Sequence, residues 1–379
     1  MRKESVEMIK SLIAYIEKYS DCDLTETETN KAFQELALQL FKFQFTFNPA
    51  YKKYAQARRK TPFTVKDWRE LPPIPIQAFK ELTLSCEPPE EAEAVFMTSG
   101  TTNADKKGKQ YHPTFRVWDE SMAGPFKHFV LPDRDRMTMF LLSPAEDVNR
   151  NSSLSRYLTK AVERFGTPNS RFFFSEAKGL DMDAVFQALQ ESEKQGEPLL
   201  LLGATFAYVH LLDAMEERGL RFRLPEGSRV FDTGGLKGQA REITADELYA
   251  RFSSDFGVER DDCINMYGMT ELCSQFYDQT IRSKHGSGVL NRLKKGPAWV
   301  RTLVLDPDTL QPLPDGETGV LAHIDLANWN SALAILTEDM GRKTEKGLDL
   351  LGRLKGSEAR GCSIAVDQLL SVARKQDQT

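Results

Sequence analysis

The sequence predicts a layered α/β protein with a largely parallel sheet, a smaller β subdomain and a helical N-terminal part. From about residue 137 to residue 266, short apolar strands alternate with amphipathic helices, which is the order that builds parallel sheets. Beyond residue 299, strands are joined by Asp-Pro-Asp and Pro-Asp-Gly turns, which favour antiparallel pairing. Before residue 90, apolar residues recur at helical spacing.

The N-terminal part is predicted to hold helices over residues 7–19 and 31–47, followed by a basic, aromatic helix over 51–60. Arg58, Arg59 and Lys60 are interpreted as a solvated face. Residues 71–76 contain three prolines, and each proline drives the preceding residue toward extended geometry. We therefore expect an ordered extended segment there.

The central part is predicted to alternate between strands and helices. Strands are expected at residues 137–142, 172–174, 198–202, 229–231 and 263–266. Helices are expected at residues 156–165 and 182–195 and through residues 210–215. The three phenylalanines at 172–174 are interpreted as one buried core strand. Ligands of such sheets bind at the carboxyl ends of the strands, so the loops there are the places to search for function.

Composition narrows the class of protein. The 379 residues carry a net charge of −5 and 40% hydrophobic residues, which is ordinary for a globular protein and gives no reason to expect a nucleic acid partner. Five cysteines without paired spacing argue against a disulfide framework and favour a reducing compartment. No apolar run is long enough to span a membrane. We expect a cytoplasmic protein.

A loop rich in hydroxyl groups follows the predicted strand end at residues 95–97. It consists of Thr98, Ser99, Gly100, Thr101 and Thr102, with Lys107 a few residues later. Backbone N–H groups and hydroxyls of such a loop can hold phosphate oxygens while a lysine neutralises charge. The spacing is not that of a Walker loop. An ordinary polar surface turn is the alternative.

A second motif, Asn265 to Glu271 (NMYGMTE), makes the pattern specific. Together with the hydroxyl-rich loop it resembles the adenylate-forming superfamily of acyl and aminoacyl ligases. The resemblance implies that the loop at 98–102 holds the phosphates of ATP and that Tyr267, Gly268 and Met269 lie near the adenine. It also implies that Thr270 contacts the α-phosphate and that Glu271 holds Mg²⁺.

Further motifs of that superfamily follow in the expected order. Gly234 and Gly235 resemble the glycine pair that packs on the adenine, and residues 316–321 match the GETG turn. Asp339 resembles the aspartate that holds the ribose hydroxyls, and Arg353 the arginine near ribose and phosphate. The cofactors implied are ATP and Mg²⁺. This agrees with chemistry, because charge gathers on the α-phosphate during attack and Mg²⁺ needs only one or two protein carboxylates.

The end of the chain resembles the acyl-protein synthetase family of bacterial fatty-acid reductase systems. Only a short segment follows the hinge at 352–353, where superfamily members usually continue with a domain that carries a catalytic lysine. The resemblance implies that acyl-AMP is formed from a long-chain fatty acid, that Cys362 accepts the acyl group, and that a fatty acyl reductase receives it. We expect residues 1–95 to be the helical N-terminal portion, 96–351 the α/β core, and 352–379 the hinge with the truncated C-terminal segment.

The acid is expected to bind after the buried strand at 198–202. The residues proposed for this pocket are Gly203, Ala204, Thr205, Phe206 and His210. A core-facing histidine is the alternative for His210. Cys22, Cys86, Cys263 and Cys273 are interpreted as small buried hydrophobes, and Lys294 and Lys295 as a solvated face.

Two other functions stay open. A ligase that delivers the acyl group to coenzyme A or another free thiol, of the phenylacetate–CoA ligase type, would not need Cys362. A nucleotide-binding subunit without turnover would keep the loop but lose catalysis; the presence of Glu271 and Asp339 speaks against it.

Overall fold

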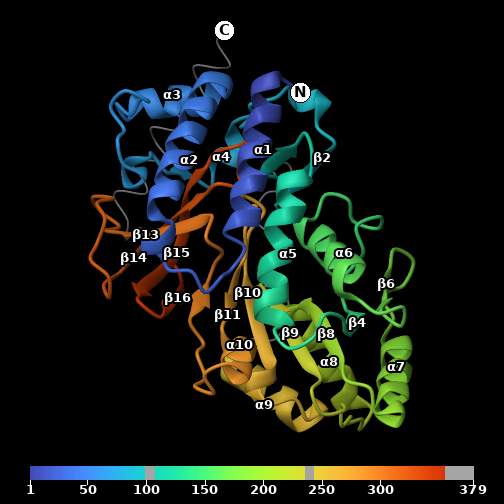
Figure 1. Cartoon of the computed structure of the whole chain (residues 1–379). Coiled ribbons are helices and arrows are strands. Elements are labelled where there is room, and N and C mark those ends of the chain that lie inside the picture. Colours follow the sequence, from blue (N-terminus) through green and yellow to red (C-terminus); the bar gives the residue numbers. More distant parts are fainter. Residues whose placement is uncertain (99–106, 235–242, 355–379) are drawn as a thin grey trace. The chain divides into compact units, whose positions relative to one another are not determined.

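The computed structural model of the chain describes residues 1–98, 107–234 and 243–354. The chain forms two compact units that alternate along the sequence. The first unit comprises residues 1–124, 269–275 and the chain from 293, and the second comprises 125–268 and 276–292. The chain therefore leaves one unit for the other after residues 124, 268, 275 and 292. Figure 1 labels the elements of both.

The second unit is built on a mostly parallel sheet. Its strands run in the order β11-β10-β9-β8-β4-β5, with all neighbours parallel except β11, which is antiparallel to β10. Their bounds are β4 Thr138–Leu141, β5 Arg171–Phe172, β8 Leu199–Ala204, β9 Arg229–Thr233, β10 Cys263–Tyr267 and β11 Phe276–Asp278. The predicted parallel sheet is confirmed.

Helices cover both faces of this sheet, as the apolar character of its strands requires. The helices of this unit are α6 Ser153–Phe165, α7 Met182–Gln195, α8 Thr205–Glu217, α9 Ala245–Arg251 and α10 Thr280–His285, with the second half of α5 Arg116–Val130. On one face, Leu201 and Val230 pack in a core with residues of α7, α8 and α9. On the other face, Phe231 stacks against Tyr157 of α6 and lies near Phe126 of α5.

Local signals set the ends of several helices. Asp181 caps the N-terminus of α7, where its side chain accepts a hydrogen bond from the Ala184 N–H. Gly196, in left-handed geometry, caps the C-terminus. The predicted range 182–195 coincides with the helix. The predicted strand at 172–174 is wrong. β5 ends at Phe172, and β6 Phe174–Ser175 pairs instead with β7 Gly179–Leu180 in a separate hairpin.

The first unit begins with long helices that pack on a curved antiparallel sheet. The helices are α1 Lys3–Lys18, α2 Glu26–Phe47, α3 Pro49–Ala57 and the single turn α4 Ala78–Glu81. α2 opens with a capping box between Thr25 and Glu28. Two hydrogen bonds join α2 and the residue after it to residues almost three hundred positions later in the chain. The Gln44 side-chain amide donates to the Asn328 carbonyl at 2.7 Å, and the Asn48 side-chain amide donates to the Ser331 carbonyl at 2.7 Å.

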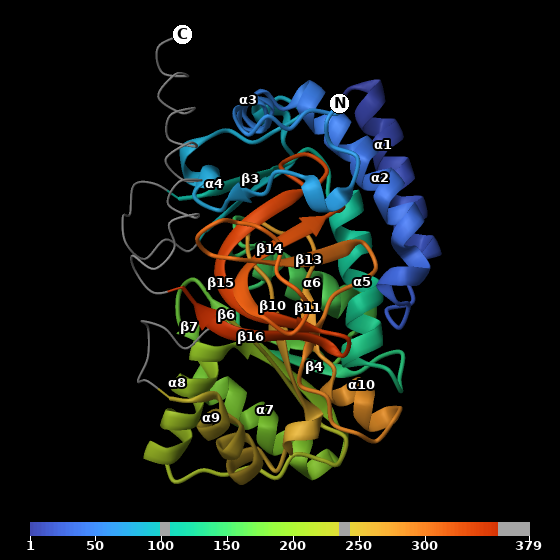
Figure 2. The same cartoon turned by 90° about the vertical axis from the view of Figure 1, so that its left-hand side faces the viewer.

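The sheet of the first unit has the strand order β13-β14-β15-β16-β12, with every neighbour antiparallel. Figure 2 shows β14, β15 and β16 side by side. The bounds are β12 Lys294–Lys295, β13 Val300–Leu305, β14 Thr318–Asp325, β15 Ala334–Thr344 and β16 Gly347–Arg353. The predicted antiparallel β subdomain is therefore confirmed. β1 Ile74–Pro75, from the proline-rich segment, is extended as predicted and pairs in parallel with β15. Lys294 is buried, so its assignment to a solvated face is wrong.

The hydroxyl-rich loop does not leave a strand of the parallel sheet. Within the described residues, the strand before it, β2 Ala94–Met97, pairs with β3 Lys109–His112 alone, in a two-stranded antiparallel sheet of the first unit. The strand was predicted, but the sequence carries no signal for its partner.

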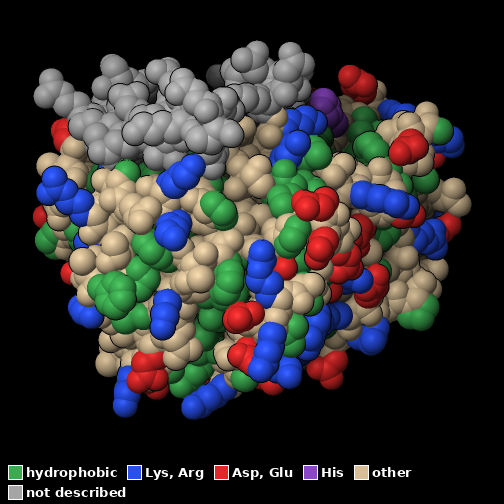
Figure 3. All heavy atoms as spheres, turned by 90° about the horizontal axis from the view of Figure 1, so that it is seen from above, with side chains coloured by type: hydrophobic (Ala, Val, Ile, Leu, Met, Phe, Trp, Pro, Cys, Tyr) green, Lys and Arg blue, Asp and Glu red, His purple; other side chains and the backbone are tan. Residues whose placement is uncertain are grey.

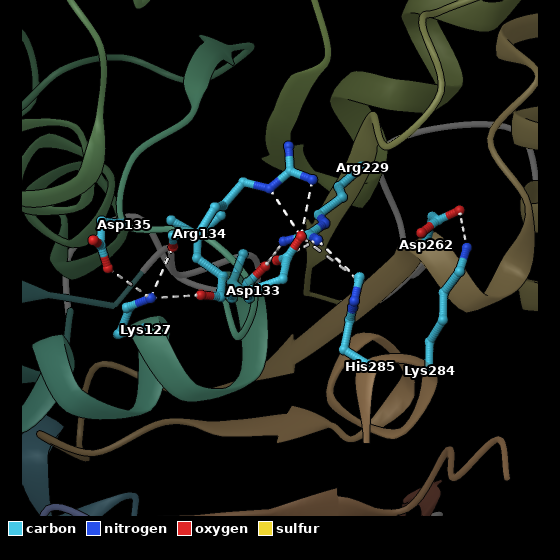
Figure 4. Close-up of polar contacts among 10 residues, drawn as sticks. Lys127, Asp133, Arg134, Asp135, Arg229, Asp262, Lys284 and His285 are labelled. Carbon is cyan, nitrogen blue, oxygen red and sulfur yellow. Dashed lines mark hydrogen bonds and ion pairs between the residues drawn. The ribbon is translucent and has the colours of Figure 1, made fainter. Parts of the chain in front are cut away.

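At the start of β9, away from the carboxyl edge of the parallel sheet, the second unit holds a buried ion pair (Figure 4). The Arg229 guanidinium donates to the Val130 carbonyl at 2.7 Å and to the Asp133 carboxylate at 2.6 Å. Its Nη2 also lies 3.1 Å from Nε2 of His285, the last residue of α10. These contacts link α5, β9 and α10.

Among the residues that the structure describes, no helix combines the length and the apolar character needed to cross a bilayer. On the face drawn in Figure 3, acidic and basic side chains are interspersed, in keeping with the small net charge of −5.

Candidate active site

At the carboxyl edge of the parallel sheet, the second unit brings two predicted groups together. Register aligns Ala204 with Thr233, and Thr233 with Met266, so β8, β9 and β10 end side by side. Thr205, the first residue of α8, donates from its buried hydroxyl toward the Thr233 carbonyl at 3.1 Å and the Gly234 carbonyl at 3.2 Å. The segment predicted for the acid is thus joined to the segment predicted for adenine.

Asp232, which the sequence analysis does not single out, organises this edge. Its carboxylate accepts hydrogen bonds from Asn265 Nδ2 at 2.7 Å, Tyr249 Oη at 2.9 Å and Thr205 Oγ1 at 3.3 Å. Burial and the charge of Asp232 raise the pKa of the Tyr249 hydroxyl, which therefore stays a donor. Asp232 holds α8, α9 and β10 to the end of β9.

Two more of the residues proposed for the acid pocket, Phe206 and His210, lie on one exposed stripe of α8. Phe206 and His210 are one helical turn apart and exposed, with ring centroids 6.5 Å apart. The core-facing alternative for His210 is therefore wrong. Gly203 is buried against Leu142, where a Cβ would meet the leucine Cβ at 3.0 Å. Tyr267, the last residue of β10, is half-buried with its ring 5.8 Å from that of Phe276.

In the first unit, the base of the hydroxyl-rich loop is closed by a reciprocal pair of hydrogen bonds. The Thr98 N–H donates to the Gly108 carbonyl at 3.0 Å, and the Gly108 N–H donates to Thr98 Oγ1 at 3.0 Å. Lys107 is exposed beside this closure. Ser99, Gly100, Thr101 and Thr102 lie outside the described residues, as does Gly235.

Glu271, Asp339 and Arg353 belong to one electrostatic neighbourhood of the first unit. Burial raises the pKa of the Glu271 carboxyl to about 7, the charges of Lys80 and Arg353 oppose that rise, and the charge of Asp339 adds to it. Asp339 and Arg353 face each other across β15 and β16, with Arg353 Nε 3.6 Å from Asp339 Oδ1. Three residues that the motifs singled out, from distant parts of the sequence, are brought together.

The arrangement fits a divalent cation. A buried carboxylate with a raised pKa lacks compensation for its charge, and Mg²⁺ binds through one or two protein carboxylates together with phosphate oxygens. Glu271 is such a carboxylate. Thr270 and Met269 beside it are half-buried, and Gly268 is exposed.

The backbone around Glu271 is fixed by a buried polar network that the sequence did not reveal. The Asn328 amide donates to the Glu271 carbonyl at 2.8 Å, and its Oδ1 accepts from the Cys273 N–H at 2.8 Å. The Asp325 carboxylate accepts from the Ser274 N–H at 2.8 Å and from the Ser274 hydroxyl at 2.7 Å. Both side chains are almost completely buried. These hydrogen bonds fix the backbone on either side of the Glu271 carboxylate.

Lys80 of α4 is another residue that the sequence analysis did not single out. It is exposed, and its charge reaches Glu271. No local pattern distinguishes it from any other lysine after an aromatic residue.

The four described cysteines are buried, as predicted. Cys22, Cys86, Cys263 and Cys273 are free and buried. Burial raises the pKa of the Cys22 thiol to about 12 and those of the other three well above the ordinary value. None of these four thiols is suited to attack at neutral pH. Cys362 lies outside the described residues.

Comparison with known proteins identifies relatives across nearly the whole chain. The family model "Acyl-protein synthetase, LuxE" matches residues 5–371. The long-chain-fatty-acid–luciferin-component ligase of Vibrio harveyi is 24% identical over 354 residues, covering 90% of this chain and 89% of the relative. The ligase of the same name from Aliivibrio fischeri is 22% identical over 357 residues, covering 90% of each.

Solved structures with a similar fold include 2-hydroxyisobutyryl-CoA ligase in complex with 2-HIB-AMP in the postadenylation state. It superposes with a TM-score of 0.62 at 15% identity, covering 87% of this chain and 69% of the other. The complex of that ligase with 2-HIB-AMP and CoA in the thioesterification state gives 0.62 at 16% identity with the same coverage. At this identity the likeness establishes the fold of an adenylate-forming enzyme.

Proposed function

Because the chain belongs to the acyl-protein synthetase (LuxE) family of ligases, we propose that it activates a long-chain fatty acid with ATP and then acylates its own Cys362. The thioester is handed to a fatty acyl reductase. Membership in this family agrees with the enzyme class expected from the motifs, an AMP-forming acid–thiol ligase.

The observation that carries the proposal is the grouping of Glu271 with Asp339 and Arg353 in the first unit. A metal-binding carboxylate beside an aspartate–arginine pair suits a nucleotide, because the carboxylate holds Mg²⁺ while the pair offers an acceptor to ribose hydroxyls and a cation to phosphate. The bound Mg²⁺ would supply charge compensation on the phosphates.

In the first step, an oxygen of the fatty carboxylate attacks the α-phosphorus of ATP. The bond to the β-phosphate breaks, and pyrophosphate leaves with the electron pair. We assign the phosphates to the loop from Thr98 to Thr102, Lys107 and Thr270. We assign the adenine to Gly234, Gly235 and the Tyr267–Met269 segment, and the ribose and α-phosphate to Asp339 and Arg353.

In the second step, the Cys362 thiolate attacks the acyl carbon, and the bond from that carbon to the AMP oxygen breaks. AMP leaves as the thioester forms. The acid itself is assigned to Gly203, Ala204, Thr205, Phe206 and His210. The exposed Phe206 and His210 would meet the chain or the carboxylate of the acid, and the buried Thr205 would orient the segment through Gly234. The family match extends through residue 362, which favours self-acylation over delivery to a free thiol.

The test is intact-protein mass after incubation with ATP, Mg²⁺ and fatty acids of increasing length. We expect a hydroxylamine-labile acyl adduct on the native chain, no adduct on Cys362→Ala, and an adduct on the control variant Cys22→Ala. If pyrophosphate forms and coenzyme A becomes acylated while the protein mass stays unchanged, the free-thiol alternative is correct. If ATP binds and no acid releases pyrophosphate, the chain is a nucleotide-binding subunit.

A further inference from the structure

α4 (Ala78–Glu81) is a single helical turn fixed between two parts of the candidate site in the first unit. On one side, Phe79 is buried beside Gly108, where a Cβ on the glycine would lie 3.4 Å from the phenylalanine Cβ. Gly108 is the residue that closes the hydroxyl-rich loop against Thr98. Figure 2 shows α4 next to β3, the strand that begins directly after Gly108.

On the other side, the residues before α4 are fastened to β15. The Ile76 N–H donates to the Leu336 carbonyl at 3.0 Å, and the Gln77 side-chain amide donates to the Glu338 carboxylate. Glu338 directly precedes Asp339. The turn that carries Lys80 therefore stands between the base of the proposed phosphate loop and the strand of the proposed ribose aspartate.

Lys80 presents a positive charge that no described residue neutralises. Its side chain is exposed and forms no ion pair within residues 1–98, 107–234 and 243–354. Arg353, the other cation near Glu271, is paired with Asp339. The charges of Lys80 and Arg353 both act to lower the pKa of the buried Glu271 carboxyl. An unpaired cation beside a metal-binding carboxylate is suited to bind an anion shared with the metal.

We propose that Lys80 is a catalytic residue of the adenylation step, whose ammonium group binds the phosphate oxygens of ATP beside Glu271. This proposal rests on the proposed function and adds a residue that the motifs do not include. In this role Lys80 transfers no proton. When the carboxylate attacks and pyrophosphate departs, negative charge spreads over the phosphate oxygens, and a cation next to them lowers the barrier. A lysine suits this task because its flexible stem lets the charge follow the departing group.

The experiment compares Lys80→Met and Lys80→Arg with Lys53→Met, an exposed lysine of α3 in the same unit. Three quantities are measured in the full chain: binding of Mg²⁺·ATP by calorimetry, fatty-acid-dependent pyrophosphate release, and thioester formation from supplied myristoyl-AMP. We expect Lys80→Met to slow pyrophosphate release by roughly 100-fold or more. Lys80→Arg should recover most of that loss, and Lys53→Met should match the native chain.

The supplied acyl-AMP separates catalysis from a merely structural effect. When acyl-AMP is supplied, no pyrophosphate departs and its binding by Lys80 is not needed. Lys80→Met should therefore form the thioester at the native rate. Equal losses in both steps, or native pyrophosphate release by Lys80→Met, would refute the role of Lys80 while leaving the proposed function intact. If the native chain binds Mg²⁺·ATP but releases no pyrophosphate with any acid, the proposed function fails. In that case the calorimetry still tests Lys80. If Lys80 binds phosphate, Lys80→Met must bind Mg²⁺·ATP more weakly than the native chain does, and equal binding would refute the role.

Discussion

Removal of the Asp133 carboxylate should strongly destabilise the second unit, because it isolates a buried guanidinium. Arg229 is 1% exposed, whereas Asp133 is 20% exposed. Asp133→Ala leaves the guanidinium with its hydrogen bond to the Val130 carbonyl and its contact with Nε2 of His285. Breaking one partner of a buried ion pair costs about 3–5 kcal/mol, and the partial exposure of Asp133 places the expected loss near 3 kcal/mol. For a unit of this size the melting temperature should fall by roughly 6–12 °C.

The assay must report on the second unit. All four tryptophans (Trp68, Trp118, Trp299 and Trp329) belong to the first unit, so their fluorescence is not a suitable probe. Hydrogen–deuterium exchange of the β9 amides, together with far-UV circular dichroism, follows the unit that contains Arg229. The control is Asp183→Ala, which removes an exposed ion pair with Arg218 and should change little.

A double variant tests whether the unpaired charge of Arg229 is the cause of the destabilisation. Asp133→Ala combined with Arg229→Met removes both charges, and we expect it to regain part of the lost stability because no buried charge is left unpaired. If Asp133→Ala is no less stable than Asp183→Ala, the pair does not stabilise the unit, and the argument from burial is wrong.

The pH dependence of this effect follows from the direction of the shift. Burial by itself raises the pKa of the Asp133 carboxyl, but hydrogen bonds from Arg134 and Arg229 outweigh it and hold the pKa well below its usual range. The stabilisation is therefore complete above the unfolded value of about 3.9 and is lost as the pH falls toward the folded value. The deficit of Asp133→Ala should be constant from pH 5 to pH 7 and should shrink in stronger acid.

Two further predictions concern the first unit. Asn328→Ala should raise the Mg²⁺ concentration that half-saturates pyrophosphate release by roughly 10–100-fold, because the Glu271 carbonyl loses a hydrogen-bond donor. A Mg²⁺ titration of pyrophosphate release checks this. The control Thr302→Val removes a buried hydrogen bond with His323 and should leave the half-saturating Mg²⁺ concentration unchanged. Burial lowers the pKa of His323 to about 3, so the folded state excludes a proton that the unfolded chain takes up below pH 6.5. The free energy of unfolding should therefore fall by up to about 1.4 kcal/mol per pH unit between pH 6.5 and pH 3, and His323→Gln should flatten that slope in urea titrations.

The sequence predicts elements well where local chemistry decides them. α7 was predicted with its observed bounds because Asp181 and Gly196 mark its ends. Residues 172–174 were misassigned because a short apolar run does not reveal where a strand changes partner. The pairing of β2 with β3 could not be predicted either, since no local pattern encodes which strand will be a neighbour.

The same division holds for the candidate site. Glu271, Asp339 and Arg353 were singled out because they occur in motifs of the superfamily. Asp325 and Asn328 were not, because their role arises from contacts more than fifty residues away in sequence, and neither lies in a recognisable pattern. Lys80 was missed for a related reason, since its significance depends on what stands beside its helix.

The alternation of the two units along the chain has a consequence for biosynthesis. The second unit can assemble almost entirely from one continuous stretch, so a growing chain has its parts by about residue 292. The first unit has to wait, because α2 and β1 are held by contacts with Asn328, Ser331 and β15, which are synthesised after the second unit. The helices made first are therefore among the last to be secured, and until then their apolar faces are exposed to chaperones and to other nascent chains.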